Sequence, residues 1–170
     1  MKSLVLTLGL ALLPAVALAA GEHAGGHGEM PGHVDGGGHG HGMAIGEPAH
    51  GSPSRTVKVT MREDYEGEEI YIFEPDELNF EAGETVRLHI VNAGEEAHEF
   101  VMDTMAANAE HKELMERFPE MEHDDPNAVR LEPGEEADIV WTFATPGTFE
   151  FACLLPGHYD AGMHGPLTVN

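Results

Sequence analysis

The stretch that decides the fold is residues 148–169, TFEFACLLPGHYDAGMHGPLTV. Its first part, 148–153, and its last part, 165–169, carry the apolar and β-branched residues that are typical of strands. Cys153 ends the first of these segments, and His158 and Met163 follow it in the loop that leads to the second. The pattern Cys-x4-His-x4-Met therefore predicts three metal-binding side chains at one end of a β-sheet.

Six further segments upstream have the alternating or continuous apolar pattern of short strands. They are residues 56–61, 69–73, 77–81, 85–92, 98–102 and 137–143. Glycine and proline turns separate them, as in Glu-Pro-Gly-Glu at 132–135. Short strands at regular spacing predict an all-β protein with a Greek-key β-sandwich.

One region, about 103–126, interrupts this rhythm and predicts a helix-loop insert. Residues 105–118 are rich in Ala, Glu, Lys, Leu and Met, which favour helices. Thr104 can cap the start of this helix, and Pro119 ends it. An acidic loop follows the proline.

Cys153 is the only cysteine of the 170 residues, which excludes a disulfide within the chain. His98 opens a predicted strand 55 residues earlier. Two imidazoles, one thiolate and one thioether form the ligand set of a mononuclear type 1 copper site. A cysteine hydrolase is a poor rival because its nucleophile usually lies at a helix N-terminus, and zinc disfavours a methionine ligand.

The N-terminal residues 1–19 predict a signal peptide that is cleaved on export, with an uncleaved anchor as the alternative. Lys2 precedes a short apolar stretch, and Ala17-Leu18-Ala19 is a small-x-small cleavage motif. We therefore expect a periplasmic protein.

Residues 20–54 predict a disordered tail, because they are rich in glycine and poor in large apolar residues. Imidazole and thioether groups on a flexible backbone can gather around a metal ion, so the tail predicts metal capture, with an inert linker as the alternative. Its candidate ligands are His23, His27, His33, His39, His41 and His50, with Met30 and Met43 between them.

The charge and length of the chain exclude several functions. With 31 acidic and 8 basic residues the formal net charge is −23, which disfavours nucleic acids and anionic membranes as partners. No apolar run after the N-terminus approaches the roughly 18 residues of a membrane span. Multidomain copper enzymes need further histidine-rich sites on additional domains, so we expect that the protein is not an enzyme.

Residues 55–170 resemble a cupredoxin. The matching segments are 73–75, 83–86, Asn92, His98, 146–153 and 156–163. The resemblance implies that His98, Cys153 and His158 are the strong copper ligands and that Met163 is the weak axial one. It also implies an opposing axial contact from the Ala97 carbonyl, with Asn92 and the backbone after His98 as outer partners of the ligands.

The insert and the tail resemble those of the periplasmic copper-tolerance cupredoxins called CopI. The residues that carry this resemblance are 99–101, the methionine-bearing helix and 118–127. A second copper region could therefore lie in the insert, and Met121 and His123 are the preferred ligands, since a loop is free to fold around an ion. Lower-ranked candidates are Met102, Met105, His111 and Met115, with His164 as an extra or alternative ligand of the first site. The alternative is that the helix merely packs on the sheet beside a solvated acidic loop.

Two functions remain at this point. The first is copper tolerance or homeostasis, through binding and redox handling of copper and with a redox or copper-transfer protein as partner. The second is electron transfer between respiratory proteins by a soluble carrier. The histidine-rich tail and the methionine-bearing insert favour the first, because an electron carrier needs neither.

Overall fold

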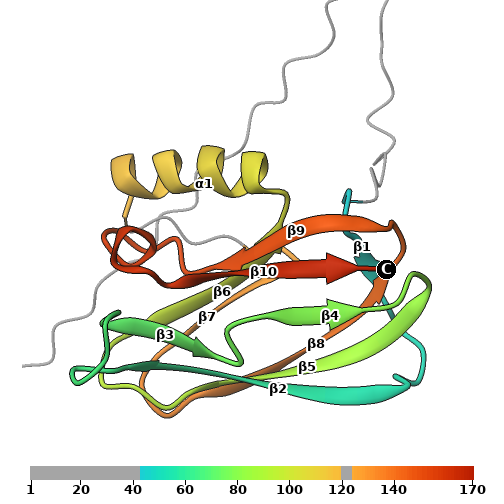
Figure 1. Ribbon diagram of the computed structural model, residues 1–170, viewed down its shortest axis with the longest axis horizontal. Helices are drawn as coiled ribbons and strands as arrows, with labels where there is room; N and C mark the ends of the chain where they lie inside the picture. Colours follow the sequence, from blue (N-terminus) through green and yellow to red (C-terminus); the bar gives the residue numbers. More distant parts are fainter. Residues whose placement is uncertain (1–42, 120–123) are drawn as a thin grey trace, which may run out of the picture. The chain divides into compact units, whose positions relative to one another are not determined.

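The computed structural model describes residues 43–119 and 124–170, and in them two five-stranded sheets pack face to face (Figure 1). The first sheet has the strand order β1-β8-β5-β2-β3, and the second has the order β4-β10-β9-β6-β7. Met121, His123, Met30, the predicted signal peptide and all tail histidines except His50 lie outside the described residues.

Each sheet draws its strands from distant parts of the chain. The first contains β1 (Gly46–Pro48), β2 (Arg55–Glu63), β3 (Tyr71–Glu74), β5 (Glu84–Asn92) and β8 (Glu136–Phe143). The second contains β4 (Leu78–Phe80), β6 (His98–Asp103), β7 (Ala128–Leu131), β9 (Gly147–Ala152) and β10 (His164–Val169). The β2–β5 and β4–β10 pairs are parallel, and the other pairs are antiparallel.

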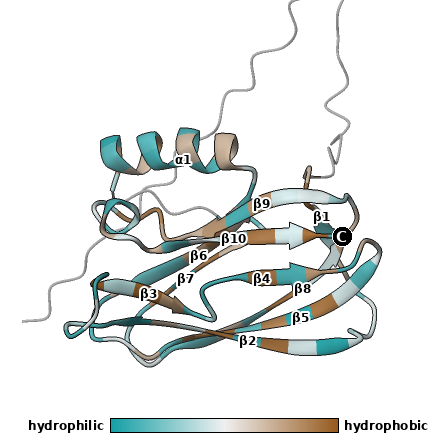
Figure 2. Ribbon diagram, viewed as in Figure 1, coloured by the Kyte–Doolittle hydropathy of each residue, from teal (hydrophilic) through white to brown (hydrophobic). Residues whose placement is uncertain are grey.

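The core lies between the two sheets and follows the alternation of the strands. In β5 every second residue is buried, including Val86, Leu88 and Ile90. Phe80 and Phe143 stack across the core with ring centroids 3.9 Å apart. Figure 2 shows the same alternation of hydrophobic and hydrophilic residues along the strands. Each fully buried side chain of this size stabilises the fold by about 1.5–3 kcal/mol.

Helix α1 (Met105–Arg117) packs on the outside of the second sheet, against β6 and β9 (Figure 1). The Thr104 hydroxyl accepts a hydrogen bond from the Ala107 N–H at 3.1 Å, which caps the helix as the sequence predicts. Only Asn108 and Met115 of the helix are buried, and its exposed surface mixes hydrophilic residues with apolar ones such as Met105 and Leu114 (Figure 2). No described helix is long and apolar enough to cross a membrane.

The predicted sandwich with a helix inserted between strands is confirmed, but two strands escaped prediction. β7 (Ala128–Leu131) is short and directly follows the acidic, proline-containing loop, which hides its pattern. β1 (Gly46–Pro48) lies within the predicted tail.

This short strand corrects the expectation that all of 20–54 is disordered. β1 pairs with β8, and Ile45 just before it is fully buried. A single large apolar residue and three strand residues in a glycine-rich segment give too weak a pattern to predict. The sandwich therefore includes residues from well before Arg55.

Candidate metal centre

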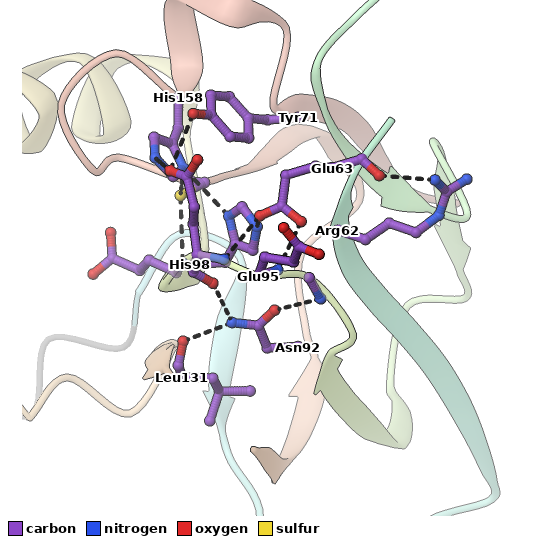
Figure 3. Close-up of polar contacts among 12 residues, drawn as sticks. Arg62, Glu63, Tyr71, Asn92, Glu95, His98, Leu131 and His158 are labelled. Atoms are coloured by element: carbon purple, nitrogen blue, oxygen red, sulfur yellow. Dashed lines mark hydrogen bonds and ion pairs between the residues drawn. The ribbon is translucent and has the colours of Figure 1, made fainter. Parts of the chain in front are cut away.

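His98, Cys153 and His158 come together in one buried group, and Figure 3 shows the two histidines of this group side by side. One ligand atom from each lies within 4.8 Å of the other two. The two Nδ1 atoms are 3.3 Å apart, and the Cys153 Sγ is 3.4 Å from the His158 Nδ1. His98 opens β6 and Cys153 follows β9, so the pairing of these neighbouring strands sets two of the three positions.

The loop from Cys153 to Met163 is closed by its own backbone. The Cys153 N–H donates to the Met163 carbonyl at 3.0 Å, and the Met163 N–H donates to the His158 carbonyl at 3.1 Å. Gly162 has φ +100°, which an L side chain rarely adopts, and a Cβ there would lie 2.7 Å from the Glu69 side chain. These constraints hold the fully buried Met163 next to the ligand loop.

The environment of Cys153 fits a bound cation. The side chain is fully buried, and the Glu99 N–H donates to its Sγ at 3.3 Å. Burial raises the pKa of the thiol to about 12, against the opposing effect of backbone hydrogen bonds from Glu99 and Leu155. A thiolate needs a nearby positive charge in such a place, and a metal ion would supply it.

His98 is fixed by a carboxylate on its far side. Its Nε2 lies 3.0 Å from the Glu63 Oε1, and Glu63 also accepts hydrogen bonds from the Glu95 and Glu96 N–H groups at 2.8 and 3.0 Å. Burial alone would raise the pKa of Glu63, but these hydrogen bonds outweigh it and hold the pKa below its usual value. An ionised Glu63 accepts a hydrogen bond from the Nε2–H group of His98. This favours the tautomer whose Nδ1 carries the lone pair, and that lone pair faces the centre.

His158 is held by an aromatic stack instead. Its ring lies parallel to that of Tyr71, with centroids 4.1 Å apart, and the Tyr71 hydroxyl donates to the Glu96 Oε2 at 3.1 Å. Burial, and then the neighbouring His98, lower the pKa of His158, which favours a neutral ring that can donate a lone pair. The His158 side chain is 10% exposed, while that of His98 is 0% exposed.

Asn92 directs its side-chain hydrogen bonds to the backbone of the loop before His98 and of β7. Its Nδ2 donates to the carbonyls of Glu96 and Leu131 at 2.8 and 2.9 Å, and its Oδ1 accepts from the Gly94 N–H (Figure 3). The hydrogen bonds fix the turn that delivers His98 into β6. Ala97, directly before His98, is partly buried.

A model of the cupredoxin-like domain matches residues 42–169 of this chain. The chain belongs to the cupredoxin family. Within that family it is similar to proteins named copper-resistant cuproprotein CopI. The one from Rubrivivax gelatinosus is 36% identical over 99% of both chains, and the one from Pseudomonas aeruginosa is 37% identical over 76% of this chain and 84% of its own. A solved structure of auracyanin B has a TM-score of 0.59 and 28% identity, covering 74% of this chain and 96% of that one.

The structure brings the two histidines and the cysteine of the predicted site together, and their supports include residues that sequence reasoning missed. Glu63, Tyr71 and Glu96 surround the two histidines, yet none follows a ligand pattern in the sequence. Glu63 reaches His98 because β2 runs parallel to β5, with Met61 beside Asn92. Parallel pairing between these strands cannot be read from their separate patterns.

The structure separates the remaining predicted ligands. Met102 and Met115 are buried in the core, while Met105 and His50 are exposed. His164 stacks on Tyr159 with centroids 4.4 Å apart and lies 3.9 Å from Glu150, outside the three-ligand group. His111 lies on the helix, far along the chain from the ligand loop, and lines a separate cavity.

Proposed function

We propose that this cupredoxin binds one copper ion through His98, Cys153, His158 and Met163, and that it protects the cell by holding copper in the periplasm after export. The buried His-Cys-His group carries this proposal. The identity of 36% to a copper-resistant CopI protein, along 99% of both chains, supports the role in tolerance.

The chain contributes a rigid, dry ligand set. Strand pairing positions His98 and Cys153, loop hydrogen bonds position His158, and the Glu63 carboxylate orients the His98 ring. Copper bound there would supply one-electron chemistry, since thiolate and thioether favour Cu(I) and imidazole serves both oxidation states. Because these contacts fix the ligand positions, the ligands would move little when a bound copper ion gains or loses an electron.

The second candidate function is soluble electron transfer, with a redox protein as the partner. The observation that favours it is the small exposed edge of His158, which brings one ligand near the surface. Both functions use the same site, so only cellular tests separate them.

The test compares a strain that lacks the gene with the same strain carrying either the wild-type chain or Cys153→Ser. The wild-type chain should bind one copper at this site with an intense thiolate-to-copper absorption and restore growth in copper. Cys153→Ser should lose both the absorption and the tolerance. Retention of the absorption by Cys153→Ser would contradict the type 1 site. A respiratory defect without copper sensitivity would favour electron transfer.

The tail histidines would bind additional copper at neutral pH and release it as they become protonated near pH 6. Replacing His23, His27, His33, His39 and His41 by alanine tests this without shortening the chain. The visible absorption should stay, and the total copper bound at pH 7 should fall. An unchanged copper content would make the segment an inert linker.

A further inference from the structure

A second group of metal-binding side chains lines a cavity beside α1, away from the cupredoxin ligands. The cavity has a volume of about 180 Å³ and lies among α1, the end of β6 and the loop before β7. Its lining includes the carboxylates of Asp103 and Asp125, the imidazole of His111 and the amide of Asn108. A cavity needs only about 10–15 Å³ to hold a water molecule, so this one has room for an ion with bound water.

The helix side of the cavity is set by its N-terminal cap. Asp103 ends β6, and its Oδ1 accepts a hydrogen bond from the Thr104 N–H at 2.7 Å. Thr104 then caps α1, so the helix starts in a fixed direction from the strand. Asn108 and His111 are three residues apart and therefore share one face of the helix.

The loop side is fixed by Asn127. Its Nδ2 donates to the Met102 carbonyl at 2.9 Å, and the Met102 N–H donates to the Asn127 carbonyl at 3.1 Å. The Ala128 N–H donates to the Asp125 carbonyl at 3.1 Å, which closes a turn. These hydrogen bonds hold Asp125 beside the end of β6, although it follows Asp103 by 22 residues.

An independent observation points to a ligand. Asn108 is 1% exposed, and its Nδ2 donates to the Glu150 Oε2 at 3.1 Å. Its Oδ1 is buried and has no hydrogen-bond partner among the described residues. Such an oxygen costs about 1–3 kcal/mol when it is left unsatisfied, and a cation or its bound water would satisfy it.

We propose that this cavity binds a divalent transition-metal ion, Cu2+ in preference to Zn2+, through His111, Asp103 and Asp125. The Asn108 carbonyl binds the ion directly or through a water molecule. Imidazole with carboxylates suits divalent ions and gives no preference for Cu+, and Cu2+ binds more tightly than Zn2+ at such sites. The donor atoms do not form a compact group like that of the first centre, so the ion draws them together and binds less tightly than the type 1 copper.

This site differs from the one that the sequence indicates in the insert. Among the predicted ligands there that the structure describes, only His111 lines the cavity, whereas Met102 and Met115 are core residues. The two aspartates carry no recognisable spacing in the sequence, because the fold brings them together. The proposal goes beyond the tolerance role and does not depend on it.

The test uses the full chain with its type 1 site loaded with copper and with alanine at His23, His27, His33, His39 and His41. Cu2+ is then added at buffered free concentrations to three proteins. They are the parent, the cavity variant His111→Gln with Asp125→Asn, and a control variant His89→Gln with Asp124→Asn. The control removes one imidazole and one carboxylate from outside the cavity lining.

The parent and the control should bind a second Cu2+ with an ordinary cupric electron paramagnetic resonance signal that lacks thiolate character. The cavity variant should bind this ion at least about tenfold more weakly, which corresponds to about 1.4 kcal/mol. An unchanged type 1 absorption in all three shows that the fold is retained. Equal Cu2+ affinity in the parent and the cavity variant would overturn the proposal. So would a loss of Cu+ binding, rather than Cu2+ binding, in the cavity variant.

Discussion

The end of the sandwich and the side of helix α1 both gather metal-binding side chains, but they do so by different means. At the end of the sandwich, paired strands and a short closed loop bring two nitrogens and a sulfur within 4.8 Å of one another in a dry site. Beside α1, a helix, a strand end and a loop surround a cavity of about 180 Å³ with oxygen-rich donors. Strand pairing preorganises the first place, whereas the second must close on its ion.

The two places also differ in where their ionisable side chains lie. The cluster of His98, Cys153 and His158 buries a thiol that is hard to ionise without a cation, and the carboxylate of Glu63 lies behind one of its histidines. The cavity presents carboxylates directly. A soft, redox-active ion suits the first arrangement, and a harder divalent ion suits the second. Four measurements can break or sharpen this contrast.

The largest expected effect concerns the Cys153 thiol in the metal-free protein. A pKa of about 12, compared with 9.0 for a free thiol, leaves roughly 1,000-fold less thiolate at pH 8. Alkylation by iodoacetamide at pH 8 should therefore be about 1,000-fold slower or more in the folded chain than in urea. Because folding favours the protonated thiol, this contribution to stability is present below pH 9 and is lost as the pH rises toward 12. Rapid alkylation of the folded chain would show that the cluster is not preorganised.

The second effect separates packing from ligation in α1. Met115 is 1% exposed, so Met115→Ala should lower the free energy of unfolding by about 2–4 kcal/mol. Leu114 is 44% exposed, and Leu114→Ala should change stability by only about 0.5 kcal/mol. Urea unfolding measures both, and the type 1 absorption and copper content should stay unchanged. If Met115→Ala bound one copper ion fewer than the wild type, Met115 would be a copper ligand and not only a packing residue.

The third effect tests the carboxylate behind His98. Glu63→Gln keeps the shape but removes the charge, so copper affinity should fall about 10- to 100-fold, as for other partners of metal-bound histidines. The reduction potential should rise, because the lost negative charge stabilised the more positive oxidised ion. The exposed Glu74, which pairs with Arg62, supplies the control Glu74→Gln. Equal potentials in both variants would mean that Glu63 only fills space.

The smallest effect lies at the start of the insert. Thr104→Ala removes the hydroxyl that accepts from Ala107 and should destabilise the protein by about 1 kcal/mol. Thr104→Ser keeps the cap and should be nearly neutral. Hydrogen exchange should quicken within 105–117 and stay the same near Cys153. Faster exchange at both places would show that the insert and the ligand cluster are coupled.

The sequence predicts most of the sandwich and its principal ligands because both depend on local pattern. Strand alternation, the cap at Thr104 and the Cys-x4-His-x4-Met spacing are all visible within short windows. The structure brings His98, which lies far upstream, next to Cys153 and His158.

What escaped prediction depends on contacts between distant segments. Glu63 supports His98 through a parallel strand pair, and Tyr71 covers His158 from the opposite sheet. Met115 resembles a ligand beside His111 on a helical wheel, but packing on the sheet buries it. Donor type can be read from a sequence, whereas the direction in which a donor faces depends on the tertiary fold.

The short strand β1 has a practical consequence for handling this protein. It lies along β8, the Ala49 N–H donates to the Val140 carbonyl at 2.8 Å, and Pro48 interrupts its outer side. A truncation that starts at Arg55 would strip this cover and leave the long, alternating β8 as an open edge, which invites aggregation by strand addition. A shortened chain intended to lack only the histidine-rich segment should therefore begin at or before Met43.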